Sequence, residues 1–188
     1  KIDVPLQYDL TNFRPSVLVF LKKKKLKNFF YFINNYINLK KNFPITFKNY
    51  NKKNKSKLMD LYYFMDRLGK ISSKKNILIT DAGSNYYIGG QVWNFEKNQK
   101  ELSSYTNAAM GLSIPLSIGA AVASPKSTIL SVTGDGSLEL NIQELKTISH
   151  NKFNIKLFVI NNGGYVSMHN WADTFFRGRR VDNPIDTG

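Results

Sequence analysis

The sequence predicts an α/β fold in which a parallel sheet carries helices on both of its faces. Short runs of β-branched and apolar residues, such as NILIT and IKLFVI, alternate along the chain with segments in which apolar residues recur at helical spacing. These runs are continuously apolar, which is typical of strands buried on both faces of a parallel sheet. Each run also stops abruptly at small polar residues, as in VTGDGS and VINNGG. Strands that alternate with helices in this way form a layered parallel architecture.

The elements expected from these patterns begin after a long irregular start. Residues 1–57 are expected to be largely irregular, apart from an apolar helix near 26–39 and a linker through KNYNKKNKSK. From Leu58 to Leu68 the apolar positions follow helical spacing, and Gly69 is a natural stop just past the last turn. Strands are then expected at 76–81, around 102–106, within 127–136 and within 155–164. Helices are expected after AGSN through residue 93, at 107–124, at 138–150 and after residue 165.

Size and composition place the chain among globular proteins. It has 188 residues, of which 42% are hydrophobic, enough for one domain of ordinary size with a sizeable core. No stretch approaches the roughly 20 uninterrupted apolar residues of a membrane span, so no membrane partner is expected. The chain has no Cys, which excludes disulfides and thiolate metal sites and makes a cytoplasmic location the default. Its N-terminus has neither an initiator Met nor a signal-peptide pattern, so we expect a removed start or a fragment.

The formal net charge of +14 raises the question of a polyanionic partner. The excess lies in residues 1–76, which hold 16 Lys and 2 Arg against 4 acidic residues, whereas charges balance in residues 77–188. The basic stretches combine Lys and Asn with Ile, Phe and Tyr, all of which have A/T-rich codons. Lys runs without Arg favour compositional drift and a solvated surface over a polyanion-binding patch, so nucleic acid is not an expected partner.

Polar side chains follow three of the expected strands, at the point where each strand ends. These side chains are Asp81, Asp135 and Asn162. Because parallel sheets bind ligands at the carboxyl ends of their strands, we expect the three to converge on one edge of the sheet. Any one of them could be only a turn residue, but that explanation does not easily account for three.

The stretch GDGS suits a phosphate ligand held together with a divalent cation. Gly134 and Gly136 let the backbone approach a ligand closely, and Ser137 adds a hydroxyl at the head of a helix, where N–H groups favour phosphate. Asp135 by itself would repel phosphate, but a cation between them reverses the sign of that interaction. Mg²⁺ prefers such a set of carboxylate, amide and phosphate oxygens. Asn162 lies 27 positions later and can supply the amide oxygen, while the glycines after it leave a backbone carbonyl free for the same metal.

GDGS followed by NNGG at this spacing resembles the diphosphate and metal signature of thiamine-diphosphate enzymes, in the pyrophosphate-binding (PP) domain of the acetolactate synthase family. The resemblance extends over roughly residues 78–179. ITDAGSNYYIGGQ resembles the stretch in which this family grips the far side of the diphosphate, and NAAMGLSIPLSIGAAVA resembles its GxMGxxxPxAIGAA segment. The resemblance implies the thiamine-diphosphate-binding fold, with thiamine diphosphate and Mg²⁺ as cofactors.

The family's functional residues carry over onto the matching positions of this sequence. The resemblance implies that Met110 is the bulky apolar residue that holds the cofactor bent, and that the backbone of Ala108 and Met110 bonds the aminopyrimidine. Taken alone, Met110 would more often be a core methionine. The implied metal ligands are Asp135, Asn162 and the carbonyl of Gly164. The cofactor-binding residues that the resemblance implies are Gly83, Ser84, Asn85, Ala108, Met110, Gly134, Asp135, Gly136, Ser137, Asn162, Gly164 and Tyr165.

The segment VSMHNWADTFF, which follows Tyr165, resembles the helix that lines the substrate side in this family. Met168 and Trp171 are the substrate contacts that the resemblance implies, because acetolactate synthases carry at the position of Trp171 a tryptophan that shapes the pocket for the acceptor 2-keto acid. Packing of Trp171 on Phe175 is an equally good explanation. Relatives with other substrates often read NNGGYxSIRxTQ here, and His169 replaces the Arg of that pattern, so the specificity subgroup stays open. His169 itself is expected at the surface.

In this family the glutamate that protonates the pyrimidine ring belongs to a separate pyrimidine-binding (PYR) domain, and no segment here resembles that domain. Glu139 and Glu144 lie on the helix after GDG, near the diphosphate end, so neither can take its place. The resemblance therefore implies a PYR domain from the rest of the polypeptide or from a second subunit, in a homodimer or homotetramer. Residues 1–57 are then expected to be a remnant of the middle domain with a linker, and residues 58–188 a PP domain truncated at its C-terminal end.

Two functions from different classes follow as hypotheses. The first is a thiamine-diphosphate- and Mg²⁺-dependent lyase or carboligase for a 2-keto acid such as pyruvate. The second is a non-catalytic phosphate- or polyanion-binding module, which would use the glycine-rich turns for another phosphate and the basic N-terminal segment as a surface. The residues leave open the donor and acceptor substrates, the product, and whether FAD binds elsewhere.

Overall fold

The computed structural model describes residue 19 and residues 30–43, 58–72 and 75–180. The chain divides into two compact units, residues 1–44 and residues 45–188. In the first unit, helix α2 (Phe30–Asn42) confirms the expected apolar helix, shifted toward the C-terminus from 26–39. The predicted linker KNYNKKNKSK and the predicted domain boundary at residue 57 lie outside the described residues.

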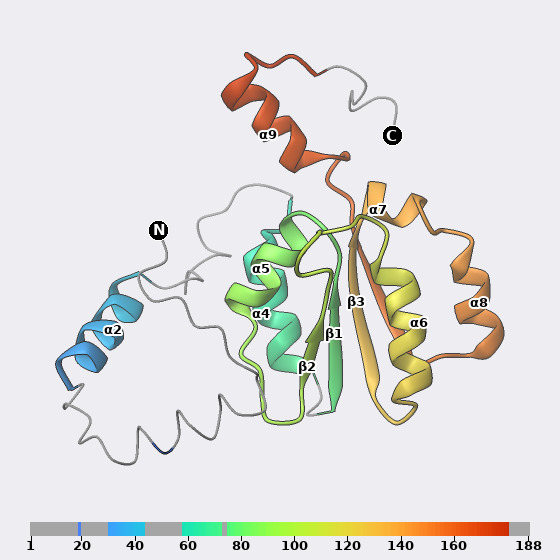
Figure 1. Ribbon diagram of the computed structural model, residues 1–188, viewed down its shortest axis with the longest axis horizontal. Helices are drawn as coiled ribbons and strands as arrows, with labels where there is room; N and C mark the ends of the chain where they lie inside the picture. The colour runs from blue at the N-terminus through green and yellow to red at the C-terminus, as the bar shows by residue number, and fades with distance from the viewer. Residues whose placement is uncertain (1–18, 20–29, 44–57, 73–74, 181–188) are drawn as a thin grey trace. The chain divides into compact units, whose positions relative to one another are not determined.

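The second unit is built on a sheet of four parallel strands (Figure 1). The strands are β1 (Asn76–Thr80), β2 (Lys100–Leu102), β3 (Thr128–Gly134) and β4 (Ile155–Ile160). Their order across the sheet is β2-β1-β3-β4, with Leu78 opposite Glu101 on one side and Leu130 on the other. This confirms the predicted parallel α/β class. The expected strand around 102–106 is β2, which lies a few residues upstream of that position.

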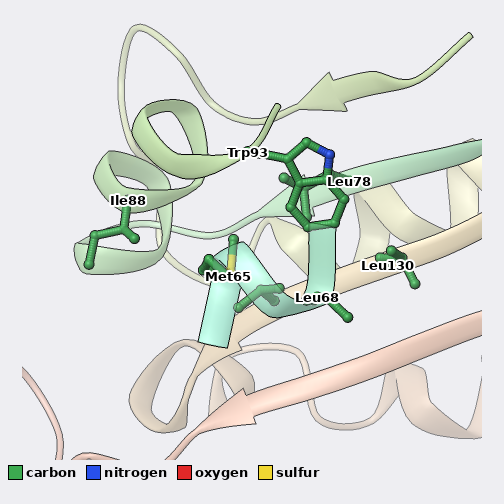
Figure 2. Packing of buried hydrophobic residues seen from close by; sticks show 7 residues of the cluster. Met65, Leu68, Leu78, Ile88, Trp93 and Leu130 are labelled. Carbon is green, nitrogen blue, oxygen red and sulfur yellow. The ribbon is translucent and has the colours of Figure 1, made fainter. Parts of the chain in front are cut away.

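One face of the sheet is covered by helices α4 (Leu61–Ile71) and α5 (Ser84–Val92). Leu78, Leu130 and Val132 reach this face and pack against Met65 and Leu68 of α4, together with Ile88 and Trp93 (Figure 2). Side chains on alternate strand positions point to the same face, which is why residues 130 and 132 of β3 share it. Burial of each such side chain stabilises the fold by roughly 1.5–3 kcal/mol.

The opposite face is covered by helix α6 (Ser113–Ala123). Ile77, Ile79 and Ile129 pack there against Ala120 and Ala121. The small side chains of α6 let the helix lie close to the strands, as its composition predicted. Helix α8 (Glu144–Asn151) lies on the outer side of α6 (Figure 1). The prediction of helices on both faces is therefore confirmed.

Helix α4 corrects the predicted stop at Gly69. Asp60 begins the helix, because its side chain accepts a hydrogen bond of 3.0 Å from the Tyr63 backbone N–H, and the helix then runs past Gly69 to Ile71. Gly69 serves packing instead, since a Cβ at this position would lie 3.3 Å from the indole ring of Trp93. Because Gly69 has no side chain, the indole ring of Trp93 can pack closely against the helix at this position.

Two further helices differ from the predicted ranges. The expected helix at 107–124 begins only at Ser113, because Ala108 and Gly111 have φ values of 46° and 78° that a right-handed helix does not allow. The expected helix at 138–150 is divided into α7 (Asp135–Glu139) and α8. Between them the backbone forms turns with hydrogen bonds between residues three positions apart. One of these bonds runs from the Asn141 N–H to the Leu138 carbonyl.

The strand order places a switch point between β1 and β3. From β1 the chain moves outward to β2, then crosses back over β1 to β3 and continues to β4. Connections that leave in opposite directions open a crevice at the carboxyl ends of the two central strands, where such sheets bind ligands. No helix in the described part of the chain has the length and apolar character needed to cross a membrane.

Candidate functional site at the carboxyl edge of the sheet

A cleft of about 250 Å³ lies at this switch point. Four segments that are distant in the sequence contribute to it, namely the turn after β1, the loop before α6, the turn after β3 and the segment after β4. Its lining residues are Ala82, Gly83, Ser84, Asn85, Tyr87, Ala108, Met110, Gly134, Asp135, Gly136, Ser137, Asn162, Tyr165, Val166, Ser167 and Met168. The lining contains all of the predicted cofactor, metal and substrate residues except Gly164 and Trp171.

Asp135 fastens the segment after β4 to the end of β3. Its Oδ2 accepts three hydrogen bonds of 3.0 Å, from the backbone N–H groups of Asn162, Gly163 and Gly164. Its Oδ1 accepts a bond of 2.9 Å from the N–H of Gly136. Burial by itself raises the pKa of this carboxyl, but the four backbone donors outweigh burial and hold the pKa below its ordinary value. Asp135 is therefore a carboxylate at neutral pH.

The turn after β1 brings backbone donors to the cleft. Gly83 has a φ of 77°, which favours glycine, and α5 begins directly after it at Ser84. The first N–H groups of a helix lack partners inside the helix, so residues 84 and 85 can offer theirs to a ligand. Asn85 is buried, and its amide nitrogen lies 3.8 Å from the point that a Cβ of Gly134 would occupy. This amide therefore lies between the ends of the two central strands.

Asp81 lies at the expected edge of the sheet, directly after β1, but it does not line the cleft as Asp135 and Asn162 do. The Asp81 side chain is 1% exposed, and its oxygens accept bonds from the N–H groups of Gly111 and Ser113, each at 3.0 Å. They also accept bonds from the Ala82 N–H and the Thr133 hydroxyl. A buried carboxylate requires such partners. Asp81 joins the end of β1 to the start of α6 and to β3, a role that its position in the sequence did not reveal.

Met110 belongs to the cleft and not to the core. Its side chain is 39% exposed and lines the cleft, whereas Met65 is fully buried between α4 and the sheet. The interpretation of Met110 as a core methionine is therefore wrong. The loop that carries it has an unusual backbone, since Ala108 adopts a positive φ without being a glycine. Such conformations cost free energy and are concentrated at functional sites.

Helix α9 (Val166–Phe175) follows the cleft segment after β4. Met168 lines the cleft, while Trp171 packs on Phe175 with ring centroids 4.8 Å apart. The packing explanation for Trp171 is thus confirmed, and a substrate contact by Trp171 stays a prediction. His169 is 7% exposed, so the expectation of a surface histidine is wrong. His169 shares one face of the helix with Ala172, three residues later, which is also buried.

Four lining residues, Ala82, Tyr87, Val166 and Ser167, were not among the predicted site residues. Ser167 lies next to the turn after β1, since a Cβ on Gly83 would be 3.5 Å from its hydroxyl oxygen. Ala82 could have been predicted as a lining residue from the sequence, because it lies directly before Gly83. Tyr87 carries no such signal, because its position in the cleft depends on the direction in which α5 leaves the sheet.

Within the described ranges, no group of three or more His, Asp or Glu side chains could hold a metal ion. Any divalent cation in the cleft would therefore combine Asp135 with neutral oxygens. Hard cations such as Mg²⁺ accept this mixture of carboxylate, amide and carbonyl ligands together with those of a bound phosphate.

Comparison with known families decides what kind of cleft this is. The family described as "Thiamine pyrophosphate enzyme, C-terminal TPP binding domain" matches residues 81–187, more than half of the chain. The chain belongs to this thiamine pyrophosphate enzyme family. The match begins at the end of β1 and includes every segment that lines the cleft. The match confirms the PP domain that the motifs GDGS and NNGG predicted. In this family the cofactor of the domain is thiamine diphosphate with Mg²⁺.

Relatives of the family extend the similarity beyond the domain. An acetolactate synthase of Arabidopsis thaliana, named as chloroplastic, is 31% identical over 142 residues, which cover 76% of this chain and 20% of that protein. The acetolactate synthase large subunit of Buchnera aphidicola is 27% identical over 190 residues, covering 98% of this chain and 32% of that protein. The chain thus spans between a fifth and a third of the length of these two relatives. Family membership does not favour the alternative of a non-catalytic polyanion-binding module.

Proposed function

We propose that this chain provides the diphosphate- and Mg²⁺-binding half of a thiamine-diphosphate-dependent lyase or carboligase that acts on 2-keto acids, similar to acetolactate synthase. The observation that supports this most strongly is the convergence of four separate segments on one cleft at the switch point of the sheet. The relatives that carry the name acetolactate synthase support the reaction class. A cytoplasmic location is part of the proposal, on the ground that the chain has no Cys.

Asp135 is the proposed anchor of the metal. Its Oδ2 accepts hydrogen bonds from three backbone N–H groups, whereas Oδ1 accepts a hydrogen bond from the N–H of Gly136 and so keeps more capacity for a cation. Asn162 bonds Asp135 through its backbone, which leaves its exposed side-chain amide to the cleft. The amide oxygen of Asn162 and the carbonyl of Gly164 would complete the protein's share of the ligands. The low pKa of Asp135 favours this role, since the carboxylate is ionised before the metal arrives.

The diphosphate would lie among glycines, hydroxyls and backbone N–H groups. Gly83, Gly134 and Gly136 line the cleft and have no side chains, so a ligand can approach the backbone there. Ser84 and Ser137 place hydroxyls in the same lining. The proposed diphosphate and metal contacts are Gly83, Ser84, Asn85, Gly134, Asp135, Gly136, Ser137, Asn162, Gly164 and Tyr165.

The ring end of the cofactor would lie against the loop before α6. Met110 offers a polarizable apolar side chain that is already in the cleft, and the backbone of Ala108 and Met110 would bond the aminopyrimidine. When bound, thiamine diphosphate supplies a carbon nucleophile that adds to the keto group and stabilises the charge left when CO₂ departs. The protein's part is to orient the ring and exclude water. Met168 and Trp171 are the proposed substrate contacts.

A second protein segment would complete the site. Asp135 is the one acidic residue among the described residues that line the cleft, and it is assigned to the metal, so the glutamate that protonates the pyrimidine would come from elsewhere. Exposed apolar side chains at the cleft, Tyr87, Met110 and Met168, are suited to contact such a segment. We propose a PYR domain of the same polypeptide or of a second subunit, in a homodimer or homotetramer.

The reaction class is tested by supplying pyruvate to the intact protein and measuring CO₂ release. We expect release that requires both thiamine diphosphate and Mg²⁺ and that falls by at least about 100-fold in Asp135→Ala, because loss of a metal ligand removes the cofactor's anchor. Asp173→Ala is the matched control, since Asp173 is an exposed carboxylate paired with Arg180. Cofactor-independent release, or equal release from Asp135→Ala, would overturn the proposal.

A further inference from the structure

Gly111 is held from two sides by residues that do not line the cleft. Its N–H donates to Asp81 Oδ1 at 3.0 Å, and its carbonyl accepts a bond of 2.9 Å from the side-chain amide of Asn141. Asp81 directly follows β1, whereas Asn141 lies in the turn between α7 and α8, 30 residues further along the chain than Gly111. Gly111 directly follows Met110. The conformation of the Met110 loop is thus fixed jointly by two elements on either side of it.

The space around Gly111 has no room for a side chain. Its φ of 78° favours glycine, and a Cβ would lie 2.8 Å from the Leu140 Cβ and 3.2 Å from the Ser137 carbonyl oxygen. The loop is therefore in van der Waals contact with the same short stretch that begins at Asp135. Asn141 adds a directed bond to this contact, and its own backbone N–H is bonded to the Leu138 carbonyl.

We propose that Asn141 is a positioning residue that sets the distance between the two ends of the thiamine diphosphate site. The inference rests on the proposed function, in which the turn at Asp135 holds the diphosphate and Met110 supports the ring. Asn141 lies in the stretch that continues from the turn at Asp135. Its side chain donates a hydrogen bond to the backbone of Gly111, the residue after Met110. A ligand that spans both ends depends on this bond, whereas a ligand that occupies only the diphosphate end does not.

Two ligands therefore distinguish positioning from general support of the fold. Asn141→Ala removes the donor, and Asn141→Asp keeps the shape but turns an acceptor toward the Gly111 carbonyl. In the intact protein with Mg²⁺, we expect either variant to bind thiamine diphosphate about five- to tenfold more weakly, as the loss of one hydrogen bond implies. Inorganic pyrophosphate should bind within about twofold of the wild type, because it does not reach Met110.

The matched control is Asn151→Ala. The Asn151 amide also donates to a backbone carbonyl, that of Thr147, at 2.8 Å, but it does so on the exposed side of α8. This variant should change the affinity for neither ligand. Equal weakening of both ligands by Asn141→Ala, or weakening of neither, would overturn the positioning role.

Hydrogen exchange separates this inference from the proposed function. We expect the Gly111 and Ser113 amides to exchange about tenfold faster in Asn141→Ala than in the wild type without any ligand, because the loop loses one of its two attachments. Unchanged exchange would overturn the inference even if thiamine diphosphate binds. A wild-type protein that binds neither ligand would instead contradict the proposed function, while the exchange rates would still decide whether Asn141 holds the loop.

Discussion

The carboxylate of Asp135 and the backbone N–H of Gly164 are joined by a hydrogen bond of 3.0 Å. The bond connects the residue after β3 with a loop that follows β4, and the N–H groups of Asn162 and Gly163 reach the same oxygen. One charged side chain thus determines the path of the chain between two neighbouring strand ends. Charge-assisted bonds of this kind are stronger than bonds between neutral groups.

Asp135→Asn should destabilise the apo protein by about 1–3 kcal/mol at neutral pH, since an amide nitrogen cannot accept from the N–H groups that it would face. The pKa of Asp135 is lowered by folding, so the stabilisation is present above the ordinary aspartate value of 3.8 and is lost as the pH falls through the lower folded pKa. The difference between variant and wild type should therefore shrink in acid. Denaturant unfolding across this pH range measures it.

Asp173→Asn is the control for that experiment. Asp173 forms an exposed ion pair with Arg180 at 2.7 Å, and pairs of this kind contribute about 1 kcal/mol or less. Similar losses of stability in the two variants would contradict the structural role assigned to the Asp135 bonds.

Two glycines near α6 should respond in opposite directions to alanine. Gly111→Ala is expected to cost about 1–3 kcal/mol, because a Cβ there would collide with Leu140 and the backbone φ is positive. Gly119 lies within α6 with nothing within 4 Å of an added Cβ, so Gly119→Ala should stabilise the protein by about 0.5–1 kcal/mol. Thermal unfolding of the two variants tests both signs, and a destabilising Gly119→Ala would contradict the open space around this position.

Alanine substitutions of Met65 and Met110 should have different effects, the first mainly on stability and the second mainly on cofactor binding. Met65 is fully buried, so Met65→Ala is expected to cost about 2–5 kcal/mol of unfolding free energy. Met110→Ala should cost less than about 1 kcal/mol, because the side chain is 39% exposed, yet it should weaken thiamine diphosphate binding severalfold. A Met110→Ala variant with undiminished affinity would remove Met110 from the site.

Glu101 on β2 provides a prediction for the pH dependence of stability. Burial raises the pKa of this carboxyl above its ordinary value of 4.5, and the hydroxyl of Thr80, 3.2 Å away, offsets only part of the effect. An acid with a raised pKa lowers stability as the pH rises from its ordinary value through the folded pKa. Glu101→Gln keeps an acceptor for Thr80, so it should be more stable than the wild type at pH 7 and equal to it in acid. Urea unfolding at both pH values decides this, and equal stability at pH 7 would contradict the burial of the charge.

Much of the fold was predictable because it depends on local patterns. Continuous apolar runs identified the central strands, and their polar ends identified the edge at which Asp135 and Asn162 meet. The loop before α6 was not predictable in this way, because its small residues suit a helix and only the bonds to Asp81 and Asn141 show why it is not one. These bonds join residues 30 positions apart.

The inward direction of some side chains was also not visible in the sequence. Asp81 and Asp135 both follow strands, yet one is buried among backbone donors and the other lines the cleft. Their difference arises from the neighbouring elements, α6 in one case and the segment after β4 in the other. The burial of His169 was likewise not visible in the sequence.

The most direct test of the central claim is a calorimetric titration of the intact protein with thiamine diphosphate, with and without Mg²⁺, for the wild type and for Asp135→Ala. The proposed arrangement predicts binding by the wild type that requires Mg²⁺ and that is lost in Asp135→Ala. Binding of equal strength without the metal, or undiminished binding by Asp135→Ala, would contradict the claim that this cleft holds the cofactor through Asp135.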